Sequence, residues 1–135
     1  MARYLLDSNI YVRAKETPEN LGKEALEAIV NPLNRLFVSV ATLWELAIKS
    51  AKGKLPFYDR LLAGGADAIR TSLEESGFQL LAIELHHTVA AAQLPRHHGD
   101  PFDRMIAAQA IAEGLTLITT DKKLGGYAGL NVLLS

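Results

Sequence analysis

Five short apolar runs recur along the chain and predict buried strands. They span residues 4–6, 36–38, 78–83, 115–118 and 130–134. The runs at 4–6 and 115–118 consist of apolar and β-branched residues, and each ends in a polar turn. That pattern is typical of strands that are covered on both faces. It therefore predicts a sheet with helices on both sides.

The segments between these runs carry apolar residues at helical spacing. The predicted helices occupy residues 18–30, 40–52, 58–76 (with a glycine pair as a weak point), 84–93 and 101–113. Asp100 and Pro101 are favoured at a helix start, and Gly53 and Gly114 at a helix end. Strands that alternate with helices indicate an α/β fold with a mainly parallel sheet, in which ligands bind beyond the carboxyl ends of the strands.

Size and composition limit the possible functions. The 135 residues, 49% of them apolar, suit a single domain over residues 1–135. The formal net charge is -1, so a polyanion must be held by a local patch or by metal ions. The chain has no cysteine, which excludes a disulfide scaffold, a thiolate zinc site and a cysteine nucleophile. The first residues meet an acid too soon for a signal peptide or membrane span, so we expect a cytoplasmic protein.

Four acidic residues stand at positions that this fold can bring together. Asp7 and Asp121 follow strand runs, so both leave the same edge of a parallel sheet. Asp103 lies in the first turn of the predicted helix 101–113, on its core-facing stripe, and Glu45 is the only charge within residues 40–48. Clustered carboxylates repel one another unless cations neutralise them. We therefore expect a hard divalent ion, Mg²⁺ or Mn²⁺, which can activate water for phosphodiester hydrolysis.

Each of these acids also has a simpler interpretation. Asp7 and Asp121 can be turn or helix-cap residues, and Asp103 can act as a favourable charge in the first turn of a helix. Glu45 can lie on an exposed helix edge and pair with Lys49, four residues further on. Spacing alone leaves these interpretations open.

Four short motifs together carry a family resemblance. They are YLLDSN at residues 4–9, the segment 39–49 with WELAIK at 44–49, DPFDR at 100–104 and TTD at 119–121. Over nearly the whole chain, the set resembles the PIN-domain family and, more narrowly, the VapC-like toxins of bacterial type II toxin-antitoxin pairs. The resemblance implies a three-layer α/β/α sandwich around a mainly parallel sheet, and an Mg²⁺- or Mn²⁺-dependent endoribonuclease acting on RNA. It also implies a homodimer and a cognate antitoxin as partner.

The resemblance also implies roles for individual residues. The acidic positions of the catalytic metal site fall on Asp7, Glu45, Asp103 and Asp121. The polar positions that support the acids or the attacking water fall on Asn9 and on Thr119 or Thr120. Asp100 is an additional acid found in one subgroup, and we assign it mainly to helix capping.

Cations near the acids in sequence are candidate RNA contacts. They are Arg104, Lys49, Lys52, Lys54, Lys122 and Lys123. A single surface cation is more often only solvated, but we expect Arg104 and Lys49 to contact RNA phosphates.

Histidine pairs and two aromatic residues receive structural interpretations. Neither histidine pair, at 86–87 or 97–98, has the helical spacing of a zinc motif, so we expect these histidines on the surface or in loops. We expect Trp44 and Phe102 in the core rather than as base-stacking platforms.

Two other classes of function remain as alternatives. A phosphatase that forms an aspartyl-phosphate would also place an acid such as Asp7 after its first strand, but its usual second acid is absent because position 9 is Asn. The other alternative is a PIN-like module that binds RNA or protein without cutting. The chain also lacks the glycine spacing of phosphate-binding loops, which argues against nucleotide-binding enzymes.

Overall fold

A five-stranded parallel sheet forms the centre of the computed structural model, which describes residues 1–96 and 99–135. The strands are β1 (Arg3–Leu6), β2 (Arg35–Ser39), β3 (Phe78–Leu81), β4 (Thr116–Thr119) and β5 (Asn131–Leu134). Their order is β3-β2-β1-β4-β5, and every neighbouring pair is parallel. The five predicted strands are therefore confirmed, and β1, which Asp7 directly follows, is central.

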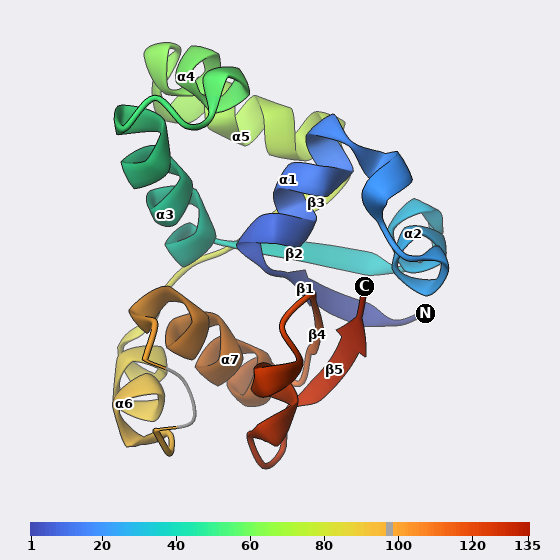
Figure 1. Ribbon diagram of the computed structural model, residues 1–135, viewed down its shortest axis with the longest axis vertical. Helices are drawn as coiled ribbons and strands as arrows, with labels where there is room; N and C mark the ends of the chain where they lie inside the picture. The colour runs from blue at the N-terminus through green and yellow to red at the C-terminus, as the bar shows by residue number, and fades with distance from the viewer. Residues whose placement is uncertain (97–98) are drawn as a thin grey trace.

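Helices cover both faces of this sheet. The described residues contain α1 (Ser8–Glu16), α2 (Lys23–Val30), α3 (Val40–Ala51), α4 (Pro56–Ala63), α5 (Gly65–Glu75), α6 (Leu85–Gln93) and α7 (Pro101–Glu113). Two 3-10 helices, η1 (Pro18–Asn20) and η2 (Lys122–Gly126), complete them. Figure 1 shows α1 to α5 on one side of the sheet and α6 and α7 on the other. The predicted α/β fold is confirmed.

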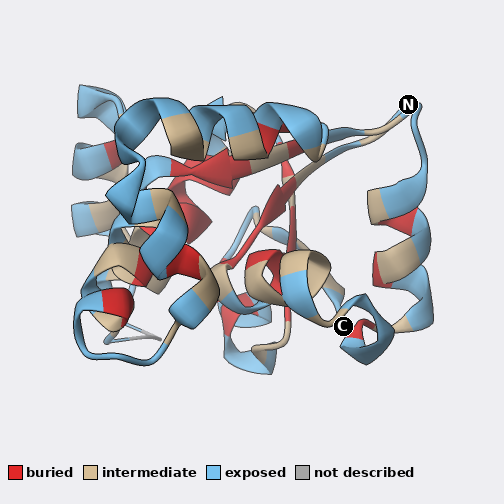
Figure 2. Cartoon of the chain, turned by 90° about the horizontal axis from the view of Figure 1, so that it is seen from above, coloured by how far each residue is buried: buried red, intermediate tan, exposed pale blue. Residues whose placement is uncertain are grey.

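Alternating strand residues supply two separate hydrophobic cores. Leu6 and Ile118 belong to the core on the side of α1 to α5, whereas Leu5 and Leu117 belong to the core against α7. Successive side chains of a strand point to opposite faces, so one apolar run can serve both cores. Figure 2 shows the buried strands enclosed by helices whose outer surfaces are exposed. Across residues 1–96 and 99–135, no helix has the length and apolar character needed to cross a membrane.

The prediction of only a polar turn after the first strand was incomplete, because α1 begins there. The Asp7 side chain accepts a hydrogen bond from the backbone N–H of Ile10 at 2.9 Å and so caps the helix. Ile10 and Tyr11 are buried against the sheet. Their branched and aromatic side chains favour strands, so local propensity did not predict a helix here. The Asp7 cap and packing against the sheet stabilise the helix instead.

Glycines mark several other helix boundaries. Gly22 caps α2 and separates it from η1, so the predicted helix 18–30 is in fact two elements. The predicted break near Gly64 and Gly65 is confirmed, since Gly65 has a φ of 79°. Gly114 ends α7 with a φ of 67°, a left-handed conformation that glycine adopts without strain.

Three helices begin at one edge of the sheet. The chain passes directly from β1 into α1 at Asp7 and from β2 into α3 at Ser39, and Figure 1 shows α7 starting at the same edge. Helix N-termini carry partial positive charge and unpaired N–H groups. This edge therefore suits acidic side chains and anionic ligands.

Candidate active site

Asp7 is the buried centre of the candidate site. It is 5% exposed, its Oδ1 accepts the Ile10 N–H, and its Oδ2 accepts the Thr119 hydroxyl. Burial raises the pKa of Asp7 above its ordinary value, the hydrogen bonds from Thr119 and Ile10 lower it, and the nearby Glu45 charge raises it further. The net shift is upward, so ionised Asp7 lacks full compensation within the protein.

Glu45 is connected to the Asp7 region by Ser8, the residue that directly follows Asp7. The Ser8 hydroxyl donates to Glu45 Oε1, and Lys49 Nζ lies 3.5 Å from Glu45 Oε2. The Glu45 side chain is 13% exposed, so it is neither a free surface acid nor fully buried. Sequence reasoning predicted the Lys49 pairing as an alternative but missed Ser8. The signal was its position directly after Asp7, which has meaning only once α1 is known.

The loop after β4 joins Asp121 to Asp7. Thr119 Oγ1, which donates to Asp7, also accepts the backbone N–H of Asp121 at 3.0 Å. Asp121 in turn caps η2 by accepting the Lys123 N–H at 2.9 Å. Thr120 contributes a backbone hydrogen bond that lowers the pKa of Asp7. A capping role for Asp121 is therefore present, and it holds the residue at the sheet edge where Asp7 lies.

Asp103 occupies the first turn of α7. Asp100 caps this helix, because its Oδ1 accepts the N–H groups of Phe102 at 2.8 Å and Asp103 at 3.3 Å. Phe102 contacts Trp44 of α3, with ring centroids 5.4 Å apart. Glu45 directly follows Trp44, and Asp103 directly follows Phe102. The aromatic contact therefore places the first turn of α7, which contains Asp103, against α3.

A buried hydrogen bond ties α3 to α7 from inside. The hydroxyl of Ser39, which caps α3, donates to Gln109 Oε1 at 2.5 Å, and both residues are fully buried. Gln109 Nε2 donates to the carbonyl of Ala82 at 3.1 Å. Sequence reasoning gave no role to Gln109 and did not predict its contact with Ser39. A glutamine within the apolar stripe of helix 101–113 was the available signal, because a buried amide needs partners.

The donor set fits a hard divalent cation. All four acids and their neighbouring hydroxyls offer oxygen, and the buried Asp7 has a raised pKa that a nearby positive charge would lower. Within the part of the chain that the structure describes, no three of these carboxylates come within 4.8 Å of one another. Asn9, the other polar position assigned by resemblance, is exposed in the first turn of α1.

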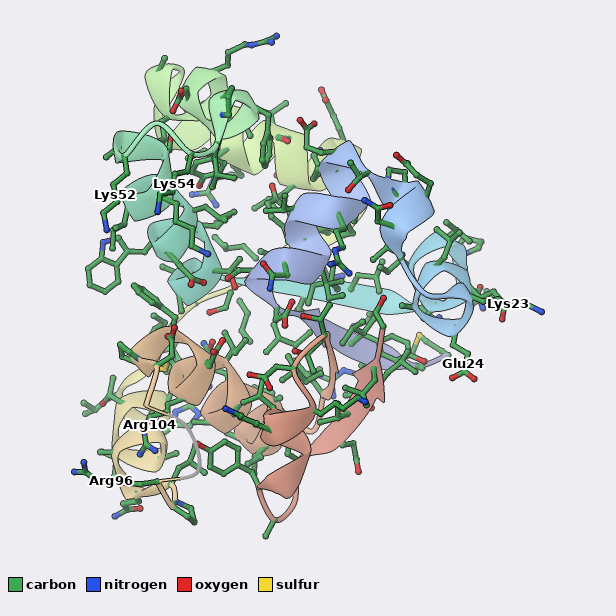
Figure 3. The ribbon with its side chains drawn as sticks, in the orientation of Figure 1. Lys23, Glu24, Lys52, Lys54, Arg96 and Arg104 are labelled. Carbon is green, nitrogen blue, oxygen red and sulfur yellow. The ribbon has the colours of Figure 1, made fainter. Side chains whose placement is uncertain are left out.

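Arg104, an expected RNA contact, is engaged within the protein. Its guanidinium donates to the carbonyls of Ala91 at 2.7 Å, Leu94 at 2.9 Å and Pro95 at 3.0 Å. Figure 3 shows it beside α6, whereas Arg96 extends outward. These carbonyls belong to the end of α6 and the following turn, so Arg104 satisfies acceptors that the helix leaves open.

Arg104→Met is therefore expected to lower the free energy of unfolding by about 1 to 2 kcal/mol, because the apolar stem is kept and three donors are lost. Urea denaturation measures this, with Arg96→Met as a control that changes stability little. If Arg104 instead serves RNA phosphates, the variant keeps its stability and the salt dependence of RNA binding falls by about one charge.

His87 corrects the expectation of surface or loop histidines. It is 1% exposed within α6, where its Nδ1 accepts the backbone N–H of Glu84 at 2.9 Å. The proton of the neutral ring therefore sits on Nε2, which donates to Glu113 Oε2 at 2.9 Å. His86 reaches the same oxygen at 3.2 Å, and these hydrogen bonds lower the pKa of Glu113.

The spacing of this cluster resembles a metal site, but its hydrogen bonding does not. His86, His87 and Glu113 are the one group of three potential ligands that lie within 4.8 Å of one another in the described residues. A metal at His87 Nε2 would displace the proton that the Glu84 contact places there. The cluster is better explained as a cap at the start of α6. His97 and His98 lie outside the described residues.

Trp44 contradicts the expectation of a core position. It is 62% exposed, and Phe102 is partly exposed and outside both hydrophobic cores. The buried face of α3 consists of Ala41, Thr42, Leu46 and Ser50. Trp44 lies on another face of the helix, so an aromatic surface adjoins the candidate site.

Comparison with known families places the fold. The PIN domain family matches residues 4–130 of the chain. No individually curated protein matches significantly.

Solved structures share the fold over almost their whole length. A chain of the VapBC2 complex of Rickettsia felis, bound to a promoter DNA fragment, has 21% identity and a TM-score of 0.71, with 98% of each chain covered. A chain of DNA-bound VapBC from Salmonella typhimurium has 21% identity and a TM-score of 0.67, again with 98% of each covered. A toxin-antitoxin complex from Klebsiella pneumoniae has 22% identity and a TM-score of 0.58, with 96% of this chain and 95% of the other covered.

Proposed function

The chain belongs to the PIN domain family, and from this premise we propose that it is an endoribonuclease that uses Mg²⁺ or Mn²⁺ to hydrolyse RNA phosphodiesters. The observation that carries the proposal is the buried Asp7 carboxylate, which contacts Thr119 and lies beside Glu45. A divalent cation would stabilise such a carboxylate strongly.

In this proposal, the carboxylates bind the ion, and neighbouring hydroxyls orient two of the carboxylates through hydrogen bonds. The ligands are Asp7, Glu45, Asp103 and Asp121. When bound, such an ion supplies a nucleophilic water near neutral pH and neutralises charge on a phosphoryl oxygen. Ser8 fixes one oxygen of Glu45, and Thr119 fixes one oxygen of Asp7, so both acids are oriented before RNA arrives. Asn9 and Thr120 are supporting candidates at the same edge.

We further infer that the protein is the toxin of a toxin-antitoxin pair, acts as a homodimer and is held inactive by a cognate antitoxin. The support is its shared fold with chains of VapBC complexes and of a toxin-antitoxin complex. A cytoplasmic location belongs to the same proposal, and so does an RNA phosphate contact by Lys49, whose side chain is 43% exposed.

Metal-dependent cleavage tests the nuclease proposal. Purified protein is incubated with single-stranded RNA and Mn²⁺, with and without chelator, beside Glu45→Gln and the control Glu24→Gln on the exposed side of α2. We expect wild type and Glu24→Gln to cleave only without chelator, and Glu45→Gln to lose roughly 100-fold in rate.

The other outcomes separate the alternatives. Cleavage that resists chelator and persists in Glu45→Gln would count against a metal site at these acids. RNA binding without any cleavage would support the non-catalytic module. Hydrolysis of a small phosphate ester, with RNA left intact, would support the phosphatase.

A further inference from the structure

An aromatic pair, of which Trp44 is exposed and Phe102 partly exposed, directly precedes two of the site acids in the sequence. Trp44 directly precedes Glu45 on α3, and Phe102 directly precedes Asp103 on α7. Their rings meet at 5.4 Å with an interplanar angle of 75°, an edge-to-face contact. Phe102 therefore supports Trp44 from one side, while 62% of Trp44 remains exposed to solvent. Two elements thus fix an indole beside the candidate site.

This exposure is unusual for the largest apolar side chain. Val40 and Ile48, one turn away on either side along the same helix face, are 37% and 36% exposed. Trp44 therefore stands out from its own neighbours. Tryptophan offers a wide flat surface that nucleobases stack on, and each stacked base contributes about 1 to 3 kcal/mol.

Two positively charged side chains near the site already have partners within the protein. The Arg104 guanidinium donates to three backbone carbonyls, and Lys49 pairs with Glu45. The formal net charge of the chain is -1. Long-range attraction of RNA is therefore weak, and a contact to the bases would supply affinity that the phosphates do not.

We propose that Trp44, supported by Phe102, is a stacking platform for an unpaired base of the RNA substrate. This inference rests on the proposed nuclease function, because a phosphodiester held at Glu45 and Asp103 places its neighbouring bases close to these rings. Lys52 and Lys54, which follow the end of α3 and are labelled in Figure 3, are exposed. An exposed tryptophan on a helix whose end carries exposed lysines favours nucleic acid over a second protein copy, because protein interfaces are depleted in lysine.

Intrinsic fluorescence tests the platform, because Trp44 is the single tryptophan of the chain. The Asp7→Asn protein with Mg²⁺, and wild type in chelator, are titrated with a short single-stranded RNA. We expect saturable quenching of the emission. An abasic oligonucleotide of equal length and charge is expected to bind more weakly and to leave the emission unchanged.

Variants separate stacking from other contributions of the side chain. Trp44→Leu is expected to weaken RNA binding roughly 5- to 150-fold, as measured by anisotropy of labelled RNA, whereas Trp44→Phe retains most of the affinity. Ile48→Ala on the same helix face is the matched control and binds as wild type does. Circular dichroism confirms that each variant is folded.

Three results would overturn the platform. They are equal quenching by the abasic strand, unchanged RNA affinity in Trp44→Leu, and a shift of the emission with protein concentration alone, which would indicate that a second copy covers Trp44. The nuclease proposal fails differently. Chelator-sensitive cleavage without quenching would contradict only the stacking role of Trp44. Quenching without cleavage would contradict only the nuclease proposal.

Discussion

Asp7→Asn is expected to lower the RNA cleavage rate by roughly two to three orders of magnitude, yet to melt at a higher temperature than wild type in chelator. The loss of activity follows from removing a buried charge that the proposed site uses to hold its cation. The gain in stability follows from the same charge, which the folded protein incompletely compensates. Cleavage assays and thermal melts of one preparation measure both effects.

The pH dependence of this gain has a definite sign. The pKa of Asp7 is raised in the folded state, first because the carboxyl is buried. The folded protein therefore keeps its proton to a higher pH than the unfolded chain, and stability falls as pH rises from the ordinary pKa of 3.8 through the folded pKa. Asn carries no charge and escapes this loss. In chelator, the difference in melting temperature should therefore grow as the pH rises above 3.8 and through the folded pKa of Asp7.

Added metal should reverse the order. At 100 times its dissociation constant, Mn²⁺ raises the stability of wild type by about 2.7 kcal/mol and that of Asp7→Asn far less. Asp67→Asn, an exposed position on α5, is the control and should respond to Mn²⁺ as wild type does. A variant that melts below wild type in chelator at neutral pH would contradict the prediction. It would mean that the hydrogen bonds to Ile10 and Thr119 outweigh the burial of charge.

Gln109→Ala is expected to lower the free energy of unfolding by about 3 kcal/mol, because it leaves a cavity and removes the acceptor of a buried hydroxyl. Gln109 is fully buried and contacts Ser39 and the carbonyl of Ala82. Urea denaturation measures the loss. Cleavage should fall as well, since the helices that carry Glu45 and Asp103 lose their internal connection.

A double-mutant cycle isolates that connection. Gln93→Ala, on an exposed glutamine of α6, controls for the change of residue and should alter stability by less than about 0.5 kcal/mol. Ser39→Ala removes the cap of α3 and costs about 1 kcal/mol. The double variant should lose less than the sum of the single variants, because both remove one shared hydrogen bond. Strict additivity would show that the contact between Ser39 and Gln109 contributes nothing.

The strands and most helices could be predicted because their signals are local. An apolar run such as that of β4 needs no distant partner to be recognised, and neither does the pairing of Asp100 with Pro101 at a helix start. Helix α1 could not be predicted from local signals. Ile10 and Tyr11 favour strands by propensity, and only the Asp7 cap and the sheet beneath them make the segment helical. Tertiary packing overrode propensity there.

The acids of the site could be nominated from sequence, but their connections could not. Glu45 was visible as a lone charge in an apolar helix, whereas the hydroxyls of Ser8 and Thr119 that hold the acids depend on which strands become neighbours. Trp44 was misplaced for a related reason. Helix α3 is apolar on two faces, and periodicity does not say that the face with Leu46 packs while the face with Trp44 stays exposed.

The sheet order has a consequence for the newly made protein. Strand β1 lies between β2 and β4, and the contact between Asp7 and Thr119 spans 112 positions of sequence. During translation, the first strand therefore lacks its second neighbour until β4, more than 100 residues later, has left the ribosome. An unfinished chain cannot complete the pocket around Asp7. If the nuclease proposal holds, an incomplete chain cannot cleave the messenger RNA from which it is being translated.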